Sequence, residues 1–241
     1  MRPALLVTGG SAGIGAALCR RAAAGGWRVL VGYNTGRDRA EALCAEIGHA
    51  RPVHLPLADT AGLDAGLASA ADEPVAAVAL CAAPPPPVLS FLKTGPDHFR
   101  AQFEAAVIGN HGVLAGAWRQ WLKPRGGGHV LAVLTAALGP PAAPHMCAYI
   151  AAKAALLGLL EAAVAELGRA GLRVTAASPG YTETAMLDAF NPLLLERARA
   201  AHPGGRFPSA DTVAAFLLDQ LRAPPDPGTL RHVRVPDTVT E

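Results

Sequence analysis

Short apolar runs alternate with longer, helix-length stretches along most of the chain. Continuous apolar runs of strand length are typical of parallel strands that are buried on both faces. The predicted strands are Leu5–Thr8, Arg28–Gly32, Val53–Leu57, Val75–Cys81, His129–Leu134, Arg173–Ala177 and Leu230–Val235, the last at an edge. Helices are predicted from the Gly9–Gly15 turn to Arg21 and near Arg37–Ile47, Leu63–Ala71, Asp97–Leu122 and Tyr149–Gly168. The alternation predicts an α/β fold, a doubly wound parallel sheet flanked by helices on both faces.

Length and composition fit one globular domain. A chain of 241 residues matches a single large α/β domain, so residues 1–241 are expected to form one unit. Hydrophobic residues make up 51% against 17% charged residues, which argues against disorder. The segment Met186–Phe207 resembles an insertion near residues 185–207 with a short helix, placed to cover a substrate. Its apolar side chains suit an acyl or polyketide chain, or they fill core beneath a loop.

Several classes of protein are disfavoured. A formal net charge of +2 gives no field for gathering nucleic acid or an anionic membrane surface. The first apolar run, Ala4–Val7, is too short for the core of a signal peptide, and no segment reaches the ~18 apolar residues of a membrane span. The histidines show no metal-ligand spacing, so no metal is expected. The four cysteines lack CxxC spacing and are expected to be free thiols in a reducing compartment, so we predict a cytoplasmic protein.

A glycine-rich turn directly follows the first predicted strand and precedes a helix. Backbone N–H groups at the start of a helix, together with the helix dipole, favour a bound phosphate. Glycines permit the tight turn and let a diphosphate approach the backbone closely. The residues predicted to contact a dinucleotide here are Gly9, Ser11, Gly13, Ile14 and Gly15. The alternative is an ordinary glycine-rich turn between a strand and a helix.

Tyr149 and Lys153 lie four residues apart at the start of an apolar helix, a spacing that puts both on one face. A phenol with a pKa of roughly 10 exchanges its proton poorly near neutral pH. A nearby ammonium stabilises the phenolate and lowers that pKa, which makes the tyrosine a usable acid or base. Isolated YxxxK pairs are common by chance, so the pair gains meaning from its place after a strand and from the glycine turn.

The glycine pattern TGxxxGIG, Thr8 to Gly15, together with the tyrosine–lysine pair, resembles the short-chain dehydrogenase/reductase family over nearly the whole chain. The resemblance implies a Rossmann-type fold and hydride transfer between a nicotinamide and a carbonyl or alcohol. Tyr149 would protonate the substrate oxygen, and Lys153 would hold the ribose hydroxyls and tune the tyrosine. Pro179 and Gly180 match the family's turn after the sixth strand. Thr184 matches the threonine that meets the carboxamide.

The end of the second predicted strand bears on the choice of cofactor. A carboxylate there would bind the ribose 2′-hydroxyl of NAD and repel a 2′-phosphate. This chain has Asn34 instead, with Arg37 nearby to pair with the phosphate, so NADP(H) is favoured over NAD(H). The basic residue that many NADP(H)-dependent members carry inside the glycine turn is replaced by Ala12. Asp59 matches the family's aspartate near the adenine, or it is a plain helix N-cap.

The reacting end departs from the family pattern at three places. Counting back from Tyr149 by the family's spacing lands on Ala136 where a serine is expected, and Thr135 could substitute only if the strand end is shifted by one residue. The family's Asn-Asn-Ala-Gly after the fourth strand reads Leu80-Cys81-Ala82-Ala83. The family's helix asparagine falls near Ala106 or Val107, and Asn110 lies about one turn further on.

Two functions therefore compete. One is an NADP(H)-dependent reductase of a ketone, possibly a β-ketoacyl or polyketide thioester, with a modified site that includes Thr135 and Asn110. The other is a catalytically silent subunit, or a cofactor-sensing scaffold, that supports an active partner. Among family members the chain most resembles β-ketoacyl-carrier-protein reductases, which implies an acyl carrier protein near Arg125 and Arg169. The helix from Tyr149, apolar almost all round, predicts a homodimer or homotetramer.

Overall fold

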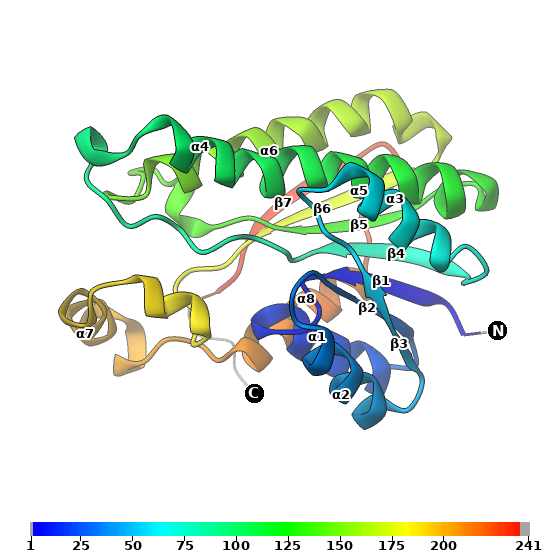
Figure 1. Ribbon diagram of the computed structural model, residues 1–241, viewed down its shortest axis with the longest axis horizontal. Helices are drawn as coiled ribbons and strands as arrows, with labels where there is room; N and C mark the ends of the chain where they lie inside the picture. Colours follow the sequence, from blue (N-terminus) through cyan, green and yellow to red (C-terminus); the bar gives the residue numbers. More distant parts are fainter. Residues whose placement is uncertain (1, 237–241) are drawn as a thin grey trace.

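A single seven-stranded parallel sheet forms the centre of the protein (Figure 1). The fold comes from a computed structural model that describes residues 2–236. The strands are β1 (Ala4–Thr8), β2 (Arg28–Tyr33), β3 (Ala50–His54), β4 (Val75–Leu80), β5 (Gly128–Val133), β6 (Leu172–Ser178) and β7 (Leu230–Arg234). Their order, β3-β2-β1-β4-β5-β6-β7, reverses direction between β1 and β4. The predicted Rossmann-type doubly wound fold is thus confirmed, and ligands of such sheets bind at this reversal, beyond the carboxyl ends of the strands.

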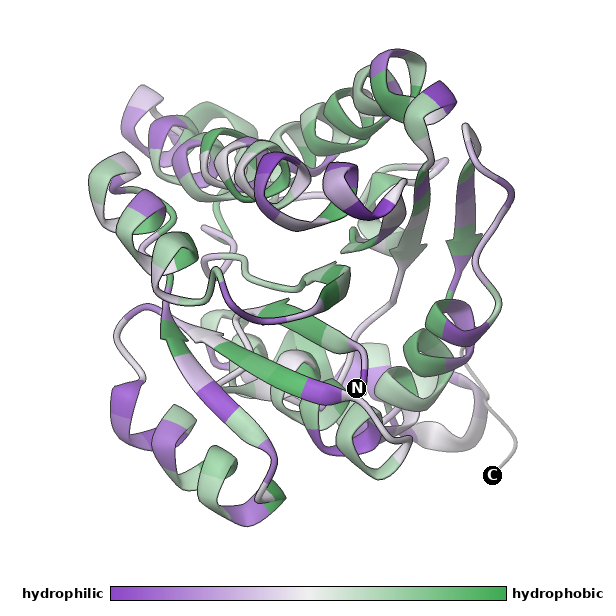
Figure 2. Cartoon of the chain, turned by 90° about the vertical axis from the view of Figure 1, so that its right-hand side faces the viewer, coloured by the Kyte–Doolittle hydropathy of each residue, from purple (hydrophilic) through white to green (hydrophobic). Residues whose placement is uncertain are grey.

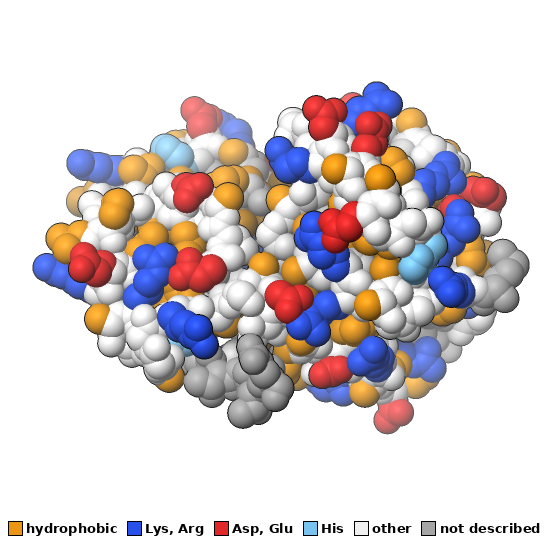
Figure 3. Space-filling view, turned by 90° about the horizontal axis from the view of Figure 1, so that it is seen from below, with side chains coloured by type: hydrophobic (Ala, Val, Ile, Leu, Met, Phe, Trp, Pro, Cys, Tyr) orange, Lys and Arg blue, Asp and Glu red, His pale blue; other side chains and the backbone are white. Residues whose placement is uncertain are grey.

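Helices cover both faces of the sheet and leave two apolar layers (Figure 1). One face is covered by α3 (Thr60–Ser69), α5 (Asn110–Ala117) and α6 (Cys147–Leu167), and the other by α1 (Gly13–Ala24), α2 (Arg37–Ile47) and α8 (Ala210–Arg222). The central strands are hydrophobic along most of their length (Figure 2), as expected for a sheet buried on both sides. On the face that carries α1, α2 and α8, basic and acidic side chains are interspersed (Figure 3).

The predicted helix Asp97–Leu122 is divided into α4 (Pro96–Phe103), a π-helical segment η2 (Glu104–Gly109), α5 and a second π-helical segment η3 (Trp118–Leu122). The remaining short helices are η1 (Phe91–Lys93), η4 (Lys123–Arg125), η5 (Ala136–Leu138) and η6 (Gly168–Ala170), and the segment after β6 contains η7 (Ala185–Ala189), α7 (Pro192–Ala201) and η8 (Pro203–Gly205). Helix α6 with its extension, Cys147–Ala170, is long and apolar enough to cross a membrane by length and composition alone. Its inner face packs on the sheet through Leu156 and Leu160, which is the behaviour of a core helix.

The third strand was wrongly predicted at Val53–Leu57. It begins at Ala50, and Pro52 lies within it, paired with Val31 of β2. Pro52 has no backbone N–H, and proline is tolerated in a sheet on an edge strand; β3 is an edge strand. Leu55 and Leu57 are buried in the layer on the α3 side, beyond the strand. Their apolar character reflects packing under a helix, which a short apolar run cannot distinguish from a strand.

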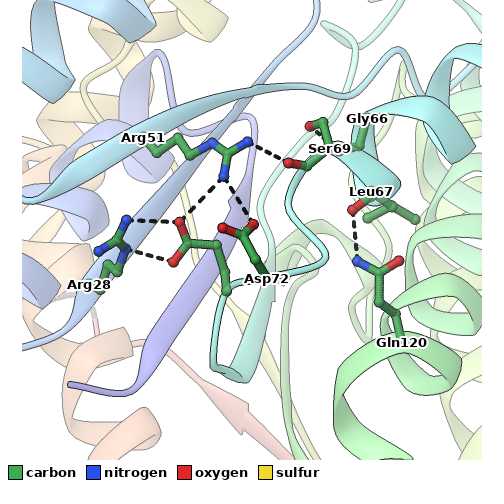
Figure 4. A network of polar contacts seen from close by, with 8 residues as sticks. Arg28, Arg51, Gly66, Leu67, Ser69, Asp72 and Gln120 are labelled. Carbon is green, nitrogen blue, oxygen red and sulfur yellow. Dashed lines mark hydrogen bonds and ion pairs between the residues drawn. The ribbon is translucent and has the colours of Figure 1, made fainter. Parts of the chain in front are cut away.

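A polar network lies at the amino ends of β2, β3 and β4 (Figure 4). Glu73, whose side chain is only 4% exposed, is gripped by Arg28, with Nε to Oε2 at 2.6 Å and Nη2 to Oε1 at 2.9 Å. Arg51 reaches Asp72 and Glu73 at 3.4 and 3.5 Å and also bonds the carbonyl of Ser69. The network joins β2, β3 and the start of β4 at the amino ends of the strands, opposite the carboxyl ends where ligands bind.

Candidate active site

The glycine turn has the backbone shape that a phosphate needs. Gly9 and Gly13 have φ angles of +64° and +51°, which favour glycine. A Cβ on Gly15 would overlap the carbonyl of Gly9, so the turn cannot accept a side chain there. At the start of α1, Ala12 is the N-cap and makes no side-chain hydrogen bond. The first amides of the helix therefore keep their donors for an anion, and the turn fits a dinucleotide diphosphate.

Two threonines hold the turn against other parts of the site. Thr8 Oγ1 accepts hydrogen bonds from the amides of Cys81 and Ala82, both at 3.1 Å, which ties the end of β1 to the end of β4. Thr184 lies against Gly13, since a Cβ on this glycine would be 3.4 Å from Thr184 Cγ2. The segment after β6, which begins with Pro179 and Gly180, is thus brought to the turn. The predicted contact of Thr184 with a carboxamide stays a prediction. The sheet order explains this meeting, because all these segments follow carboxyl ends of strands.

The end of β2 presents arginines, but Arg37 is already engaged. Its Nε donates to Glu41 Oε1 at 2.8 Å, one turn along α2. Arg39 was missed by the sequence reasoning and lies closer to the turn: a Cβ on Gly36 would be 2.6 Å from Arg39 Nη2 and 2.7 Å from Ser11 Oγ. Asn34, two residues before Gly36, is exposed. The signal in the sequence was the short spacing, because Gly36 caps α2 and Arg39 lies in its first turn, three residues later.

Asp59 occupies the N-cap position of α3, the alternative left open by the sequence. Its carboxylate makes no capping hydrogen bond, and the residue is exposed. The backbone alone shapes this helix start, since the Asp59 carbonyl accepts from Leu63 N at 2.9 Å. The side chain is therefore available to a ligand at the carboxyl edge of the sheet.

Tyr149, Lys153 and Thr135 come together where β5 meets the start of α6. Tyr149 lies in the first turn of α6 and is 8% exposed, and its hydroxyl is hydrogen-bonded to the Thr135 side chain. Lys153 is 2% exposed and donates from Nζ to the carbonyl of Val133 at 2.7 Å. The same Nζ lies 5.8 Å from the centre of the Tyr149 ring. The three side chains thus form one buried polar cluster.

Burial dominates the protonation equilibria of this cluster. It raises the pKa of the Tyr149 phenol, and the hydrogen bond with Thr135 opposes that rise. Burial also lowers the pKa of the Lys153 ammonium to about 8, against a smaller opposing effect of Cys81. The expected lowering of the tyrosine pKa by Lys153 was therefore wrong for the protein alone. The ammonium is directed to a backbone carbonyl, and the low polarity around the phenol outweighs its charge.

Thr135, not Ala136, faces the tyrosine. Its Oγ1 also accepts a hydrogen bond from Ala137 N at 3.2 Å and thereby caps η5. Ala136 already belongs to η5, and its amide donates to the Pro179 carbonyl at 2.8 Å. Thr135 thus lies one residue further from Tyr149 than the family spacing, and its role in place of the serine stays a prediction.

Asn110 is buried and opens α5, directly after the π-helical segment η2. Its Nδ2 donates to the carbonyl of Ala106, one turn earlier, at 3.0 Å. Its Oδ1 has no hydrogen-bond partner among the residues the structure describes. A buried acceptor without a partner is costly and commonly binds an ordered water. Asn110 therefore satisfies the chemical requirement for propping a water inside the protein.

Apolar side chains of the segment 185–207 cover the tyrosine. Leu187, Phe190 and Leu195 of this segment form a buried cluster with Tyr149. Phe207 closes the same cluster and stacks on Tyr181, with ring centres 5.0 Å apart. Leu193 and Leu194 of α7 are exposed instead, at 55% and 42%. In this conformation the segment 185–207 acts as an apolar cover over the reacting end.

Residues 3–193 match the family model described as short chain dehydrogenase. The chain belongs to this family. Among curated members, a 3-oxoacyl-[acyl-carrier-protein] reductase of Staphylococcus aureus is 28% identical, covering 92% of this chain and 93% of the relative. An L-rhamnose 1-dehydrogenase (NAD(P)(+)) of Azotobacter vinelandii is 31% identical over 89% and 87%. A crystal structure of a Brucella melitensis 3-ketoacyl-(acyl-carrier-protein) reductase, complexed with NADH, has the same fold, with a TM-score of 0.85, 24% identity and 96% of each chain covered.

Within this short chain dehydrogenase, two predicted carrier contacts are not near the tyrosine of the same chain. Arg125 precedes β5, where it donates to the carbonyls of Pro74 and Val75 at 3.1 Å. Arg169 precedes β6, in η6. Both therefore lie at the amino ends of the parallel strands, opposite Thr135 and Tyr149. Their expected position at the mouth of the site was wrong for a single chain. Sequence spacing shows which strand each arginine is near, but not that it lies at the end of that strand opposite the site.

Proposed function

We propose that this protein is an NADP(H)-dependent reductase of a ketone, with Tyr149 as the proton donor. The observation that carries the proposal is the buried Thr135–Tyr149–Lys153 cluster beside a glycine turn shaped for a diphosphate. The turn and the first amides of α1 would hold the diphosphate, with Ser11 and Thr184 beside it. When bound, the nicotinamide supplies a hydride for the carbonyl carbon.

The chain's own residues carry the proton chemistry. Thr135 and Tyr149 would both donate to the carbonyl oxygen, so the charge that develops there meets two fixed donors. Tyr149 then gives up its proton. Lys153, whose ammonium lies beside the ring, stabilises the resulting phenolate. Asn110 Oδ1 offers an acceptor for a water that returns the proton to the cluster.

The choice of NADP(H) is supported by the end of β2. A 2′-phosphate there would meet Arg39 and Ser11, which approach each other across Gly36, and Arg37 if it leaves Glu41. An arginine pairs with phosphate through two parallel N–H bonds, which makes it selective for that group. No carboxylate stands between β2 and Gly36 to take the ribose hydroxyl.

The substrate class is supported by the apolar cover. Leu187, Phe190 and Phe207 would face a hydrocarbon chain, which favours an acyl or polyketide thioester over a sugar. The S. aureus relative is named as a 3-oxoacyl-[acyl-carrier-protein] reductase and the A. vinelandii relative as an L-rhamnose 1-dehydrogenase, so both substrate types belong in the test. An acyl carrier protein as partner and a location in the cytoplasm remain predictions.

Stopped-flow absorbance tests this function. NADPH oxidation is followed with β-ketoacyl thioesters and simple ketones, and NADP⁺ reduction is followed with L-rhamnose. We expect turnover with a thioester or ketone, and its loss in Tyr149→Phe with cofactor binding retained. Turnover that survives Tyr149→Phe unchanged would remove the tyrosine mechanism. Tight cofactor binding without turnover on any substrate would favour the silent subunit.

A further inference from the structure

A cavity of about 230 Å³ lies at the carboxyl ends of β5, β6 and β7. These ends point toward the side of the molecule where α7 lies (Figure 1). The cavity is lined by Thr135, Ala136, Leu138, Gly139, Ser178, His232 and Arg234. A water molecule occupies about 30 Å³ of liquid, so the cavity has room for a small organic or inorganic ion.

The polar lining favours an anion. Among the lining residues that belong to the described range 2–236, Arg234 is a cation, while none is an aspartate or glutamate. A guanidinium has five N–H donors and suits the oxygens of carboxylate and phosphate. It can therefore serve a ligand beside its other interactions. Ala136 and Leu138 add a small apolar wall, which leaves space for a short hydrocarbon next to the charge.

Ser178 and His232 supply a second donor. The Ser178 hydroxyl, in a residue only 5% exposed, lies 2.8 Å from His232 Nε2. If the hydroxyl donates to Nε2, the neutral ring carries its proton on Nδ1; if Nε2 donates, the hydroxyl hydrogen is left over. In each arrangement the pair keeps one N–H or O–H donor that its own hydrogen bond does not use. We propose that this cavity binds a small oxyanion, a carboxylate or a phosphate.

The cavity shares a wall with the reacting end. Thr135 lines it and is also hydrogen-bonded to Tyr149. Ala136, another wall residue, fixes the turn by donating to the Pro179 carbonyl. An oxyanion held here would thus settle the turn that aims the Thr135 hydroxyl. The anion is either a free ion or an acidic group of the substrate itself. This link to catalysis rests on the proposed reductase function, whereas the binding site does not.

Binding is tested without turnover, by NMR titration of the whole protein with inorganic phosphate and with acetate at constant ionic strength set by chloride. We expect saturable shifts with at least one anion, at least about tenfold weaker binding in Arg234→Gln, and a smaller loss in Ser178→Ala. Arg222→Gln is the matched control, because α8 leads to the beginning of β7 and places Arg222 at the other edge of the sheet. Absence of saturation, or equal weakening in Arg222→Gln and Arg234→Gln, overturns the site.

Kinetics distinguish the two sources of the anion. For a substrate group, the KM of a keto acid rises at least about tenfold in Arg234→Gln, the KM of its neutral amide is unchanged, and phosphate competes with the acid. For a free ion, phosphate changes kcat toward the neutral amide without competing with it. Either result supports coupling to Thr135. Anion binding with neither effect overturns the coupling and leaves the reductase proposal standing.

Discussion

Replacing Thr135 by valine separates the two candidate positions for the missing serine. Valine keeps the shape of the side chain and removes only the hydroxyl, which caps η5 at 3.2 Å from Ala137 N and bonds Tyr149. Loss of one donor to a developing oxyanion typically lowers kcat by about 10²–10³, or about 2.7–4 kcal/mol. The lost cap and hydrogen bond together cost about 2 kcal/mol of stability, which a folded domain with about 5–15 kcal/mol can tolerate.

The assay is kcat for ketone reduction, followed by NADPH absorbance, in Thr135→Val, Thr135→Ser and the double variant Thr135→Val/Ala136→Ser. Circular dichroism melts confirm that each variant is folded. We expect Thr135→Ser to stay within a few-fold of the parent, because it keeps the hydroxyl. The double variant should stay as slow as Thr135→Val, since Ala136 belongs to η5. Recovery of activity in the double variant would place the oxyanion donor at 136 and refute this assignment.

Four further predictions follow from single features of the fold. Arg39→Ala should raise the KM for NADPH about 10–100-fold and leave the KM for NADH nearly unchanged. Arg37→Ala should raise the KM for NADPH less, because Arg37 is paired with Glu41. Equal increases in the two variants would contradict the geometry around Gly36. Lys153 should titrate near pH 8 in NMR of the methylated protein, with the exposed Lys93 and Lys123 as comparators. The pKa of Lys153 is lower in the folded protein than in the unfolded chain, so burial of its charge destabilises the fold fully below about pH 8. This destabilisation is relieved as the pH rises from about 8 toward about 10.4. Over that window the free energy of unfolding should therefore increase more in the parent than in Lys153→Met. Glu73→Ala should cost about 2–3 kcal/mol in urea unfolding by leaving Arg28 and Arg51 without their shared carboxylate, whereas an exposed control, Glu46→Ala, should cost under about 1 kcal/mol; similar losses would argue against the network. Light scattering should show a dimer or tetramer that Gly158→Arg, on the exposed side of α6, converts to monomers; a monomeric parent would end the oligomer prediction.

The sequence was sufficient for the fold class and for the elements that carry the glycine turn and the Tyr149–Lys153 pair, because these rest on local patterns. The glycine turn, the apolar strands and the Tyr149–Lys153 spacing are each contained in a short window. Predictions from position along the chain failed where loop length or tertiary packing determines which residue lies in the site. A count that assumes a fixed loop length leads to Ala136, whereas the structure places the neighbouring Thr135 against Tyr149, so the count alone could not choose between them.

Effects of burial were also beyond the sequence. The spacing of Tyr149 and Lys153 gave their shared face, but the direction of each pKa shift depends on the apolar cover and on the Val133 carbonyl. Both come from segments distant in sequence. The same is true of Arg39, since its approach to Ser11 depends on how α2 packs beside the glycine turn.

If Tyr149 is the proton donor, as proposed, the apolar cover over it would also link the length of a substrate to the supply of protons. A phenol that is 8% exposed exchanges slowly with bulk water while Leu187, Phe190 and Phe207 lie over it. A long acyl chain would keep the cover raised and give solvent a route to the hydroxyl between turnovers. A small ketone would let it close, so that regeneration of the acid depends on internal relays through Thr135, Lys153 and a trapped water.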